Sequence, residues 1–310
     1  MTFSEGMARG PIAMLEGALG ERLKREFGLP IDGPVAMADL VLRPEGRAAL
    51  LRLWREYRDI AWAHGLPFFA TTPTRRANRA RMERAGHGPE LIAQNVALLR
   101  SLAQGGPMCV GRLMGCRGDA YTGEGALPRQ EARAFHRWQA EAFRRAGADF
   151  LLAGILPTAP EAQGMAQAMA ETGLPYVLSL TLRRDGRLVD GTRLCDLIRE
   201  TDALLGEGRP AFYMSNCIHP DAVRAALDQA FNRCGAVQAR FLGVQANPSP
   251  RSFAELDGAE ALQGDAPEPW AEAMLRLHHA HPMRLLGGCC GTDGRHMAAL
   301  AARLTAEAGN

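Results

Sequence analysis

The feature that most constrains the fold is an eightfold alternation between short apolar segments and longer segments with helical spacing. The short segments, rich in Val, Ile, Leu and Phe, occupy residues 11–15, 66–71, 107–113, 149–155, 175–181, 210–216, 239–246 and 283–288. A helical pattern follows each one, and several of these patterns begin at Pro, Ser, Thr or Asp and end at Gly, as helix caps favour. Eight strands that each precede a helix predict an α/β protein with a single (β/α)8 TIM barrel.

The length and composition agree with one barrel domain over residues 1–310. With 47% hydrophobic and 23% charged residues, the chain has enough apolar side chains for a sizeable core. The segment richest in Pro, Gly and Ser, residues 247–269, is interpreted as a long loop after the seventh strand. A doubly wound open sheet is the alternative, but no Gly-x-Gly-x-x-Gly motif follows the first strand.

The charge balance narrows the classes of partner. The 36 basic and 34 acidic residues give a net charge of +2, which leaves no broad basic surface for nucleic acid. No apolar run approaches twenty residues and no leader precedes the first strand, so we expect no membrane partner and a cytoplasmic protein with reduced thiols. The expected partners are small molecules, and a homo-oligomer is left open.

Three cysteines lie where a barrel places its functional residues, at the carboxyl ends of strands. Cys217 directly follows the sixth segment. Cys289 and Cys290 directly follow the eighth segment, in a glycine-rich turn. Side chains from these two strands can converge, and three thiolates with a fourth position open would form a catalytic zinc site. The alternative is that the three cysteines only pack in or beside a tight turn.

The other cysteines are expected to be structural. Cys109 lies inside a strand segment, while Cys195 and Cys234 lie in helical segments, so all three are interpreted as small buried hydrophobic residues. Cys116 lies in the loop after the third strand and could approach the mouth of the barrel. His219 begins a helix, and we expect it to cap that helix or face solvent rather than bind a metal.

Four motifs together resemble the homocysteine S-methyltransferase family. They are "LEGALGERL" near the start, "GDAYTG" after the third strand, "SNCIHP" after the sixth and "GGCCGT" after the eighth. The resemblance runs from about residue 12 to about residue 305. It implies that Cys217, Cys289 and Cys290 bind Zn2+ and that the open position takes the sulfur of homocysteine.

The resemblance also implies the type of reaction. A methyl group would pass from a small donor to the zinc-bound thiolate, with no catalytic residue beyond the metal site. The family includes betaine-dependent, S-methylmethionine-dependent and cobalamin-dependent members. No cobalamin-binding module is attached here, which favours S-methylmethionine, S-adenosylmethionine or a betaine-like compound as the donor.

The substrate-binding residues are expected at the strand ends. Glu16 matches an Asp of the family's first-strand motif and is expected to hold a substrate ammonium. Arg75 or Arg76 could meet a carboxylate. The remaining candidates are Thr72, Asp119, Tyr121, Ser179, Asn216 and Asn247.

One position departs from the family. Gly154 stands at the end of the fourth strand, where family members carry a Glu that binds the amino group of homocysteine. The loss of one partner of a buried ammonium costs on the order of a few kcal/mol. Two alternatives therefore stay open: the same zinc chemistry on a different small thiol, and a non-catalytic barrel that binds zinc or senses thiols.

Overall fold

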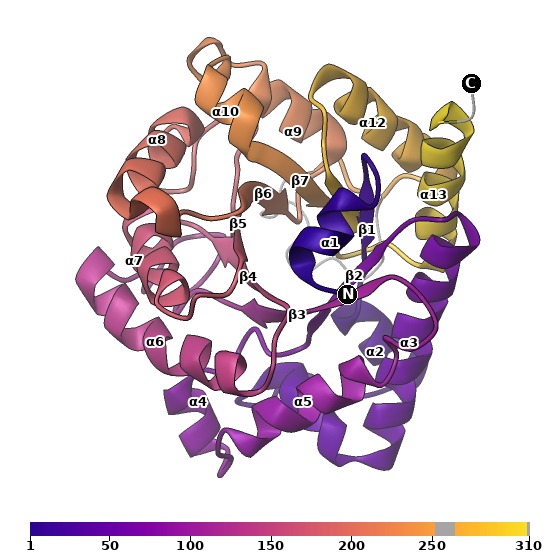
Figure 1. The fold of residues 1–310 in the computed structure, drawn as a ribbon, viewed down its shortest axis with the longest axis vertical. Coiled ribbons are helices and arrows are strands. Elements are labelled where there is room, and N and C mark those ends of the chain that lie inside the picture. The colour runs from indigo at the N-terminus through magenta and orange to yellow at the C-terminus, as the bar shows by residue number, and fades with distance from the viewer. Residues whose placement is uncertain (252–263, 309–310) are drawn as a thin grey trace.

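The computed structural model describes residues 1–251 and 264–308 and contains a closed barrel of parallel strands, paired in chain order with β8 against β1 (Figure 1). The eight strands are β1 Ala13–Leu15, β2 Phe68–Thr72, β3 Met108–Met114, β4 Phe150–Leu156, β5 Tyr176–Leu180, β6 Phe212–Asn216, β7 Phe241–Ala246 and β8 Leu285–Gly288. Each boundary lies within two residues of the sequence-based prediction. The predicted (β/α)8 barrel is confirmed.

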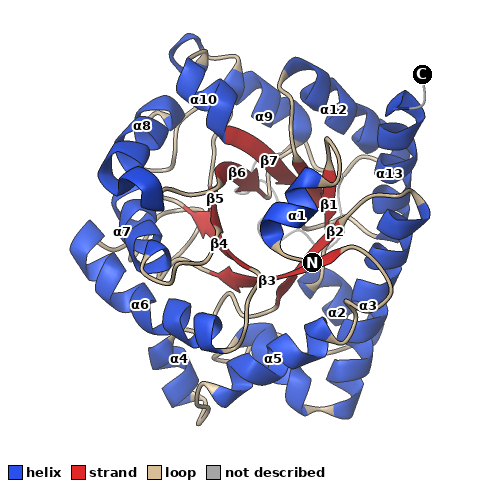
Figure 2. Cartoon of the chain, in the orientation of Figure 1, coloured by secondary structure: helices blue, strands red, loops and turns tan. Residues whose placement is uncertain are grey.

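Helices form a continuous outer layer around the strands (Figure 2). The α-helices are α1 Phe3–Ala8, α2 Gly20–Phe27, α3 Pro44–Ala63, α4 Arg79–Arg84, α5 Glu90–Arg100, α6 Arg129–Arg145, α7 Ala159–Ala170, α8 Leu194–Leu205, α9 Pro220–Leu227, α10 Gly235–Arg240, α12 Pro267–Ala280 and α13 Gly294–Ala308. The 3-10 helices of the described residues are η1 Ala36–Leu42, η2 Gly206–Gly208 and η3 Ala230–Asn232. None of the described helices is long and apolar enough to cross a membrane.

The helical sequence pattern that follows the sixth strand, over residues 219–235, is interrupted in the structure. The structure ends α9 at Leu227 and starts α10 at Gly235, with η3 between them. The side chain of Asn232 donates to the backbone oxygens of Gly186 and Ala226 and accepts from the N–H of Cys195. The bonds to Gly186 and Cys195 tie Asn232 to other segments at the point where the helical pattern is interrupted.

The amino-terminal end of the barrel is closed by α1, which lies across it in Figure 1. Phe3 is buried there, and its ring packs against Phe69, Phe150 and Phe212 at centroid distances of 5.8, 5.2 and 6.2 Å. Cys109 joins this inner cluster, as predicted for a buried hydrophobic residue. The plug leaves the carboxyl-terminal end as the open mouth.

The expectation of reduced thiols is wrong for this structure, which contains two disulfides. Cys195 pairs with Cys234, and Cys217 pairs with Cys289. Cys195 and Cys234 are therefore not simply buried hydrophobic residues: they join the start of α8 to the residue before α10. Cys116 is buried, and its thiol donates to the backbone oxygen of Gly118 at 3.4 Å.

A candidate three-cysteine metal centre

The sheet register brings the predicted cysteines together across β7. Asn216, the last residue of β6, is in register with Gln245, and Gly288, the last residue of β8, is in register with Ala246. The next residues are Cys217 and Cys289. Their N–H groups donate to the backbone oxygens of Gln245 and Ala246 at 3.0 and 2.8 Å. The two strands that flank β7 therefore each place a cysteine at its carboxyl-terminal end.

Tight turns direct the side chains of these cysteines. Cys217 has φ 55°, a left-handed conformation that non-glycine residues seldom adopt. In the other turn, the backbone oxygen of Cys289 accepts from the N–H and the hydroxyl of Thr292 at 3.0 and 2.7 Å. A Cβ on Gly288 would lie 2.3 Å from that hydroxyl, so the turn requires glycine there.

The three sulfurs fit a metal ion. The Sγ atoms of Cys217, Cys289 and Cys290 all lie within 4.8 Å of one another, and those of Cys217 and Cys290 are 3.7 Å apart. A tetrahedral zinc with bonds of about 2.3 Å separates its sulfur ligands by about 3.8 Å. In the described part of the chain, no other group of three His, Cys, Asp or Glu residues is gathered this closely. The Cys217–Cys289 disulfide must be reduced before both thiolates are available.

A cavity of about 560 Å³ opens beside the sulfurs. Cys217 and Cys290 line it, together with the predicted residues Tyr121 and Asn247. Asn247 is only 7% exposed, and among the described residues its Oδ1 has no hydrogen-bond partner. The cavity therefore places a buried acceptor near the thiols, with room for a small molecule.

The charges around Cys290 oppose one another. Although Cys290 is exposed as a residue, desolvation of its thiol at the barrel mouth raises the pKa of that thiol, the carboxylate of Glu21 raises it further, and the guanidinium of Arg75 lowers it. Glu21 is held by the N–H of Gly291, which donates to its Oε2 at 2.5 Å. An unliganded Cys290 is therefore a poor thiolate at neutral pH, and a cation at the site would stabilise its ionised form.

A row of polar side chains crosses the barrel interior below the mouth. The hydroxyl of Ser179 donates to Oδ1 of Asn216, and Nδ2 of Asn216 donates to Oε1 of Gln245. Gln245 in turn donates to the backbone oxygen of Glu16 at 3.3 Å. The structure thus brings together the predicted residues Ser179, Asn216 and Glu16. Gln245 was missed, although a polar residue inside an apolar strand pattern was a usable signal.

Glu16 is buried against the end of β2. Its carboxylate accepts from the N–H and the hydroxyl of Thr71, at 2.8 and 2.6 Å for the shorter contacts. Burial raises the pKa of Glu16 to about 8, against the lowering effect of these bonds. The predicted residue Thr72 is not brought to this group, because its buried hydroxyl is bonded to that of Thr74 at 2.7 Å.

Asp119 and Tyr121 belong to one turn after β3. The carboxylate of Asp119 accepts from the N–H groups of Tyr121 and Thr122 at 2.7 and 2.8 Å. These backbone bonds lower the pKa of Asp119. Asp119 is exposed and shapes the turn, whereas Tyr121 is half-buried and reaches the cavity.

Gly154 lies beside the polar row. A Cβ at this position would lie 3.2 Å from Cδ1 of Leu113, and 3.8 Å from both Oδ1 of Asn216 and Cβ of Ser179. A side chain there would enter the barrel next to Asn216. Because residue 154 is glycine, it contributes no charge to the mouth of this barrel.

His219 has a structural role, as expected. Its Nδ1 accepts from the N–H of Asp221 at 3.2 Å and so caps α9. Its Nε2 lies 3.1 Å from the carboxylate of Asp265, at the far end of the loop after β7. Both ring nitrogens are thus occupied away from the cysteines.

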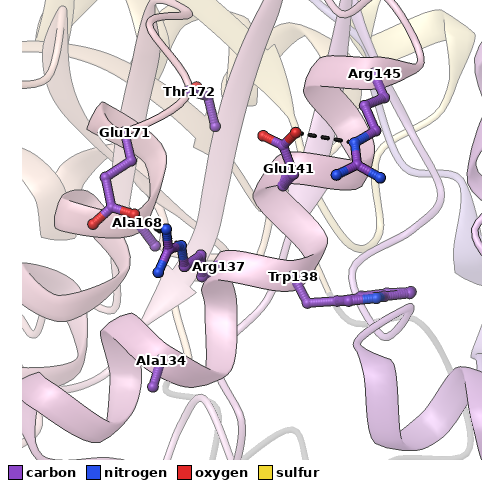
Figure 3. A pocket seen from close by; sticks show the side chains of 8 residues that line it. All are labelled: Ala134, Arg137, Trp138, Glu141, Arg145, Ala168, Glu171 and Thr172. Carbon is purple, nitrogen blue, oxygen red and sulfur yellow. Dashed lines mark hydrogen bonds and ion pairs between the residues drawn. The ribbon is translucent and has the colours of Figure 1, made fainter.

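A second hollow lies in the outer helical layer, between α6 and α7 (Figure 3). Its charged residues pair with one another: Glu141 with Arg145 at 3.0 Å, and Glu171 with Arg137 at 3.2 Å. The ring of Trp138 lies along its wall. The residues that line this hollow include no cysteine or histidine, so the mouth is the stronger candidate site.

Comparison with known proteins identifies the family to which the sequence is similar. The family model described as homocysteine S-methyltransferase matches residues 13–304. A protein named homocysteine S-methyltransferase, from Escherichia coli K12, is 30% identical over 194 residues, which cover 60% of this chain and 57% of that protein.

Two solved structures share the fold. The oxidised form of the homocysteine methyltransferase MmuM from Escherichia coli superposes with a TM-score of 0.75 at 24% identity, covering 95% of this chain and 97% of that chain. Its apo form superposes with a TM-score of 0.66 at 25% identity, covering 95% and 96% of the two chains. The barrel is therefore similar over nearly the full length of both proteins.

Proposed function

Because the chain belongs to the homocysteine S-methyltransferase family, we propose that it is a zinc-dependent thiol S-methyltransferase. The acceptor is homocysteine, so the product is methionine, and the reaction takes place in the cytoplasm. The donor is a small onium compound of the S-methylmethionine, S-adenosylmethionine or betaine type. The observation that carries the proposal is the cluster of three cysteine sulfurs within 4.8 Å at the open end of the barrel.

Three cysteine ligands suit a metal that activates a thiol. Bound zinc would lower the pKa of an acceptor thiol and so keep it as a nucleophilic thiolate at neutral pH. Cys217, Cys289 and Cys290 would hold the ion, since three anionic sulfurs leave one tetrahedral position open. Three neutral histidines would leave a more electrophilic metal, suited to activating water.

The rest of the chain orients the two substrates. In the transfer, a bond forms between the acceptor sulfur and the methyl carbon, while the bond from that carbon to the onium atom breaks. The electron pair stays on the leaving group, which becomes neutral, so no general base is needed for this step. The cavity beside Cys217 and Cys290 would align the donor with the acceptor sulfur.

Two groups at the mouth suit the substrates' polar ends. Glu16 would bind an ammonium, whose charge would favour the ionised carboxylate despite its burial. Asn247 offers an unpartnered buried oxygen to an N–H donor, and Tyr121 offers an aromatic face for an onium methyl group.

A second acceptor class is favoured by Gly154. Since no side chain projects from this position beside Asn216, one site for a substrate ammonium is absent. A small thiol without an amino group could undergo the same reaction without that ammonium-binding site.

The experiment measures metal content and thiol binding together. We expect reduced wild-type protein to contain about one zinc per chain, and homocysteine to bind with release of a proton. Cys289→Ser is expected to lose most of the zinc and the proton release, whereas Cys116→Ser, in a buried loop position, should keep both. Methyl transfer is then followed with each donor.

Two results would contradict the proposal. A protein that binds neither metal nor thiol after reduction cannot carry out this reaction. Zinc that is retained with no exchangeable ligand, and whose removal unfolds the protein, would instead support a structural or sensing barrel.

A further inference from the structure

One loop at the mouth keeps its shape by hydrogen bonds and has almost no buried core of its own. It spans residues 115–128, between β3 and α6, and it brings Tyr121 to the cavity. The N–H of Asp119 donates to the backbone oxygen of Glu124 at 2.9 Å, which closes a turn around Tyr121. Beyond its first two residues, only Ala120 of this loop is buried. The position of the turn must therefore be set by neighbouring elements.

A buried carboxylate on α7 holds both ends of this loop. Oε1 of Glu161 accepts from the N–H of Arg117 at 2.7 Å, and Oε2 accepts from the N–H of Leu127 at 3.3 Å. Glu161 itself is fully buried in the first turn of α7. Buried polar groups that lose their partners cost free energy, so these bonds resist separation. One side chain thus joins the two ends of the loop to a helix outside it.

His136 on α6 holds Glu161 in turn. Its Nε2 lies 3.0 Å from Oε1 of Glu161, and neither side chain is exposed. A carboxylate oxygen accepts, so Nε2 is the ring nitrogen that carries the proton in this contact. The two helices are in close contact here, since a Cβ on Gly164 of α7 would lie 2.6 Å from Cβ of Ala132 on α6. The pair is therefore fixed between two packed helices.

The middle of the loop is held from a different element. The hydroxyl of Thr181, the first residue after β5, donates to the backbone oxygen of Ala120 at 2.7 Å. Contacts from α7 and β5 together thus fix the turn that carries Tyr121. Tyr121 lines the same cavity as Cys217 and Cys290. If the ends of the loop were released, the turn would pivot at Ala120 and move Tyr121 relative to the sulfurs.

We propose that Glu161, held by His136, is a positioning residue for the methyl donor and acts through Tyr121. The inference rests on the function proposed above and deepens it. An aromatic face attracts an onium methyl group only when the ring lies against it, and loss of that contact weakens binding about 3- to 30-fold. Glu161 lies behind the loop and does not line the cavity, so it contacts neither substrate. Its effect is on the donor, because the acceptor sulfur is held at the cysteines.

The test is Glu161→Gln, which keeps the shape of the side chain but places an NH2 group where a backbone N–H now contacts an oxygen. We expect KM for the donor to rise about 3- to 30-fold, with KM for the acceptor unchanged. Tyr121→Ala should raise KM for the donor by a similar factor. The double variant should be no weaker than Tyr121→Ala alone, because the two residues act on one contact.

A matched control removes a carboxylate from the other end of α7. Glu171 pairs with Arg137 at 3.2 Å on the outer surface, and Glu171→Gln should behave as wild type (Figure 3). If Glu161→Gln does not fold, His136→Leu is the second variant. It removes one donor to Glu161 and leaves both backbone contacts, so a smaller loss that is again confined to the donor is expected.

Two measurements without turnover separate this inference from the proposed reaction. Amide hydrogen exchange should be faster over residues 115–128 of Glu161→Gln and unchanged in α6 and α7. Calorimetry with S-methylmethionine, S-adenosylmethionine and betaine, in the absence of an acceptor thiol, should show at least one of them binding about 3- to 30-fold more tightly to wild type than to Glu161→Gln.

Four results would overturn the role of Glu161. They are unchanged exchange in the loop, faster exchange throughout α6 and α7, equal donor binding to both proteins, and no donor binding to wild type. A double variant in which the two losses multiply would also contradict it, since Glu161 would then act independently of Tyr121. Failure of methyl transfer alone, with the binding difference intact, would count only against the proposed function.

Discussion

At the residue scale, the mouth combines two groups, Glu16 and Cys290, whose ionisation is disfavoured by desolvation. The pKa of Cys290 is raised, and that of Glu16 is raised to about 8. Both groups would gain from a positively charged partner, which for Cys290 is the proposed metal and for Glu16 a substrate ammonium. Both pKa shifts are in the direction that binding of a cation would reverse.

The raised pKa of Glu16 predicts how stability depends on pH. Between pH 4.5, its ordinary value, and about pH 8, the folded state keeps a proton that the unfolded state loses. Stability from this group is therefore fully present below pH 4.5 and falls as pH rises to about 8. The Gln in Glu16→Gln cannot ionise, so this variant should not lose that stability. The free energy of unfolding of Glu16→Gln minus that of wild type should therefore increase by a few kcal/mol from pH 5 to pH 8.

Denaturant unfolding of both proteins at several pH values measures this difference. Glu268→Gln is a suitable control, because the Glu268 side chain is 67% exposed and pairs with Arg303 at 3.6 Å on the surface. A constant difference between Glu16→Gln and wild type across this range would show that Glu16 is already ionised in the folded protein.

At the element scale, the start of α9 links the three-cysteine cluster to the loop after β7. His219 caps this helix and contacts Asp265, although it follows Cys217 by only two residues. We expect His219→Ala to lower the free energy of unfolding by about 1 kcal/mol, as loss of a helix cap does, and to leave zinc binding intact.

Chemical denaturation and metal analysis of the same samples test this. His219→Asn restores a side chain that can cap the helix and should regain most of the stability. Loss of zinc in both variants would identify His219 as a ligand and contradict the geometry seen here.

The strands were predictable because each is a short apolar segment bounded by polar or glycine-rich sequence. The grouping of Cys217 with Cys289 and Cys290 was predictable for a related reason, since strand ends of a parallel barrel share one face. The disulfide between two distant helical segments was not predictable. Cys195 and Cys234 are 39 residues apart in the sequence, and no local pattern links them.

The details of the site also depend on register. Thr71 rather than Thr72 contacts Glu16, because adjacent strand residues face opposite sides of the sheet. Gln245 joins the polar row only because β7 aligns it with Asn216. Likewise, the space above Gly115 that Arg75 occupies arises from two loops meeting in three dimensions.

At the scale of the whole molecule, the barrel separates stability from chemistry. The inner aromatic cluster around Phe3 closes one end, and the cysteines stand at the other. A strand rises about 3.3 Å per residue, so strands of three to seven residues span about 10–23 Å between the two ends. Changes at the plug should therefore affect folding and leave the site unchanged.

Phe3→Ala tests that separation. Phe3 is 5% exposed and packs on three aromatic rings from β2, β4 and β6, so its truncation leaves a cavity that α1 cannot fill. We expect a loss of about 3–4 kcal/mol in unfolding free energy, measured by denaturant titration. Phe27→Ala, at a half-buried aromatic residue on α2, should cost less. Zinc content and KM for the acceptor should match wild type in both variants, and an altered KM in Phe3→Ala would mean that the plug sets the geometry of the mouth.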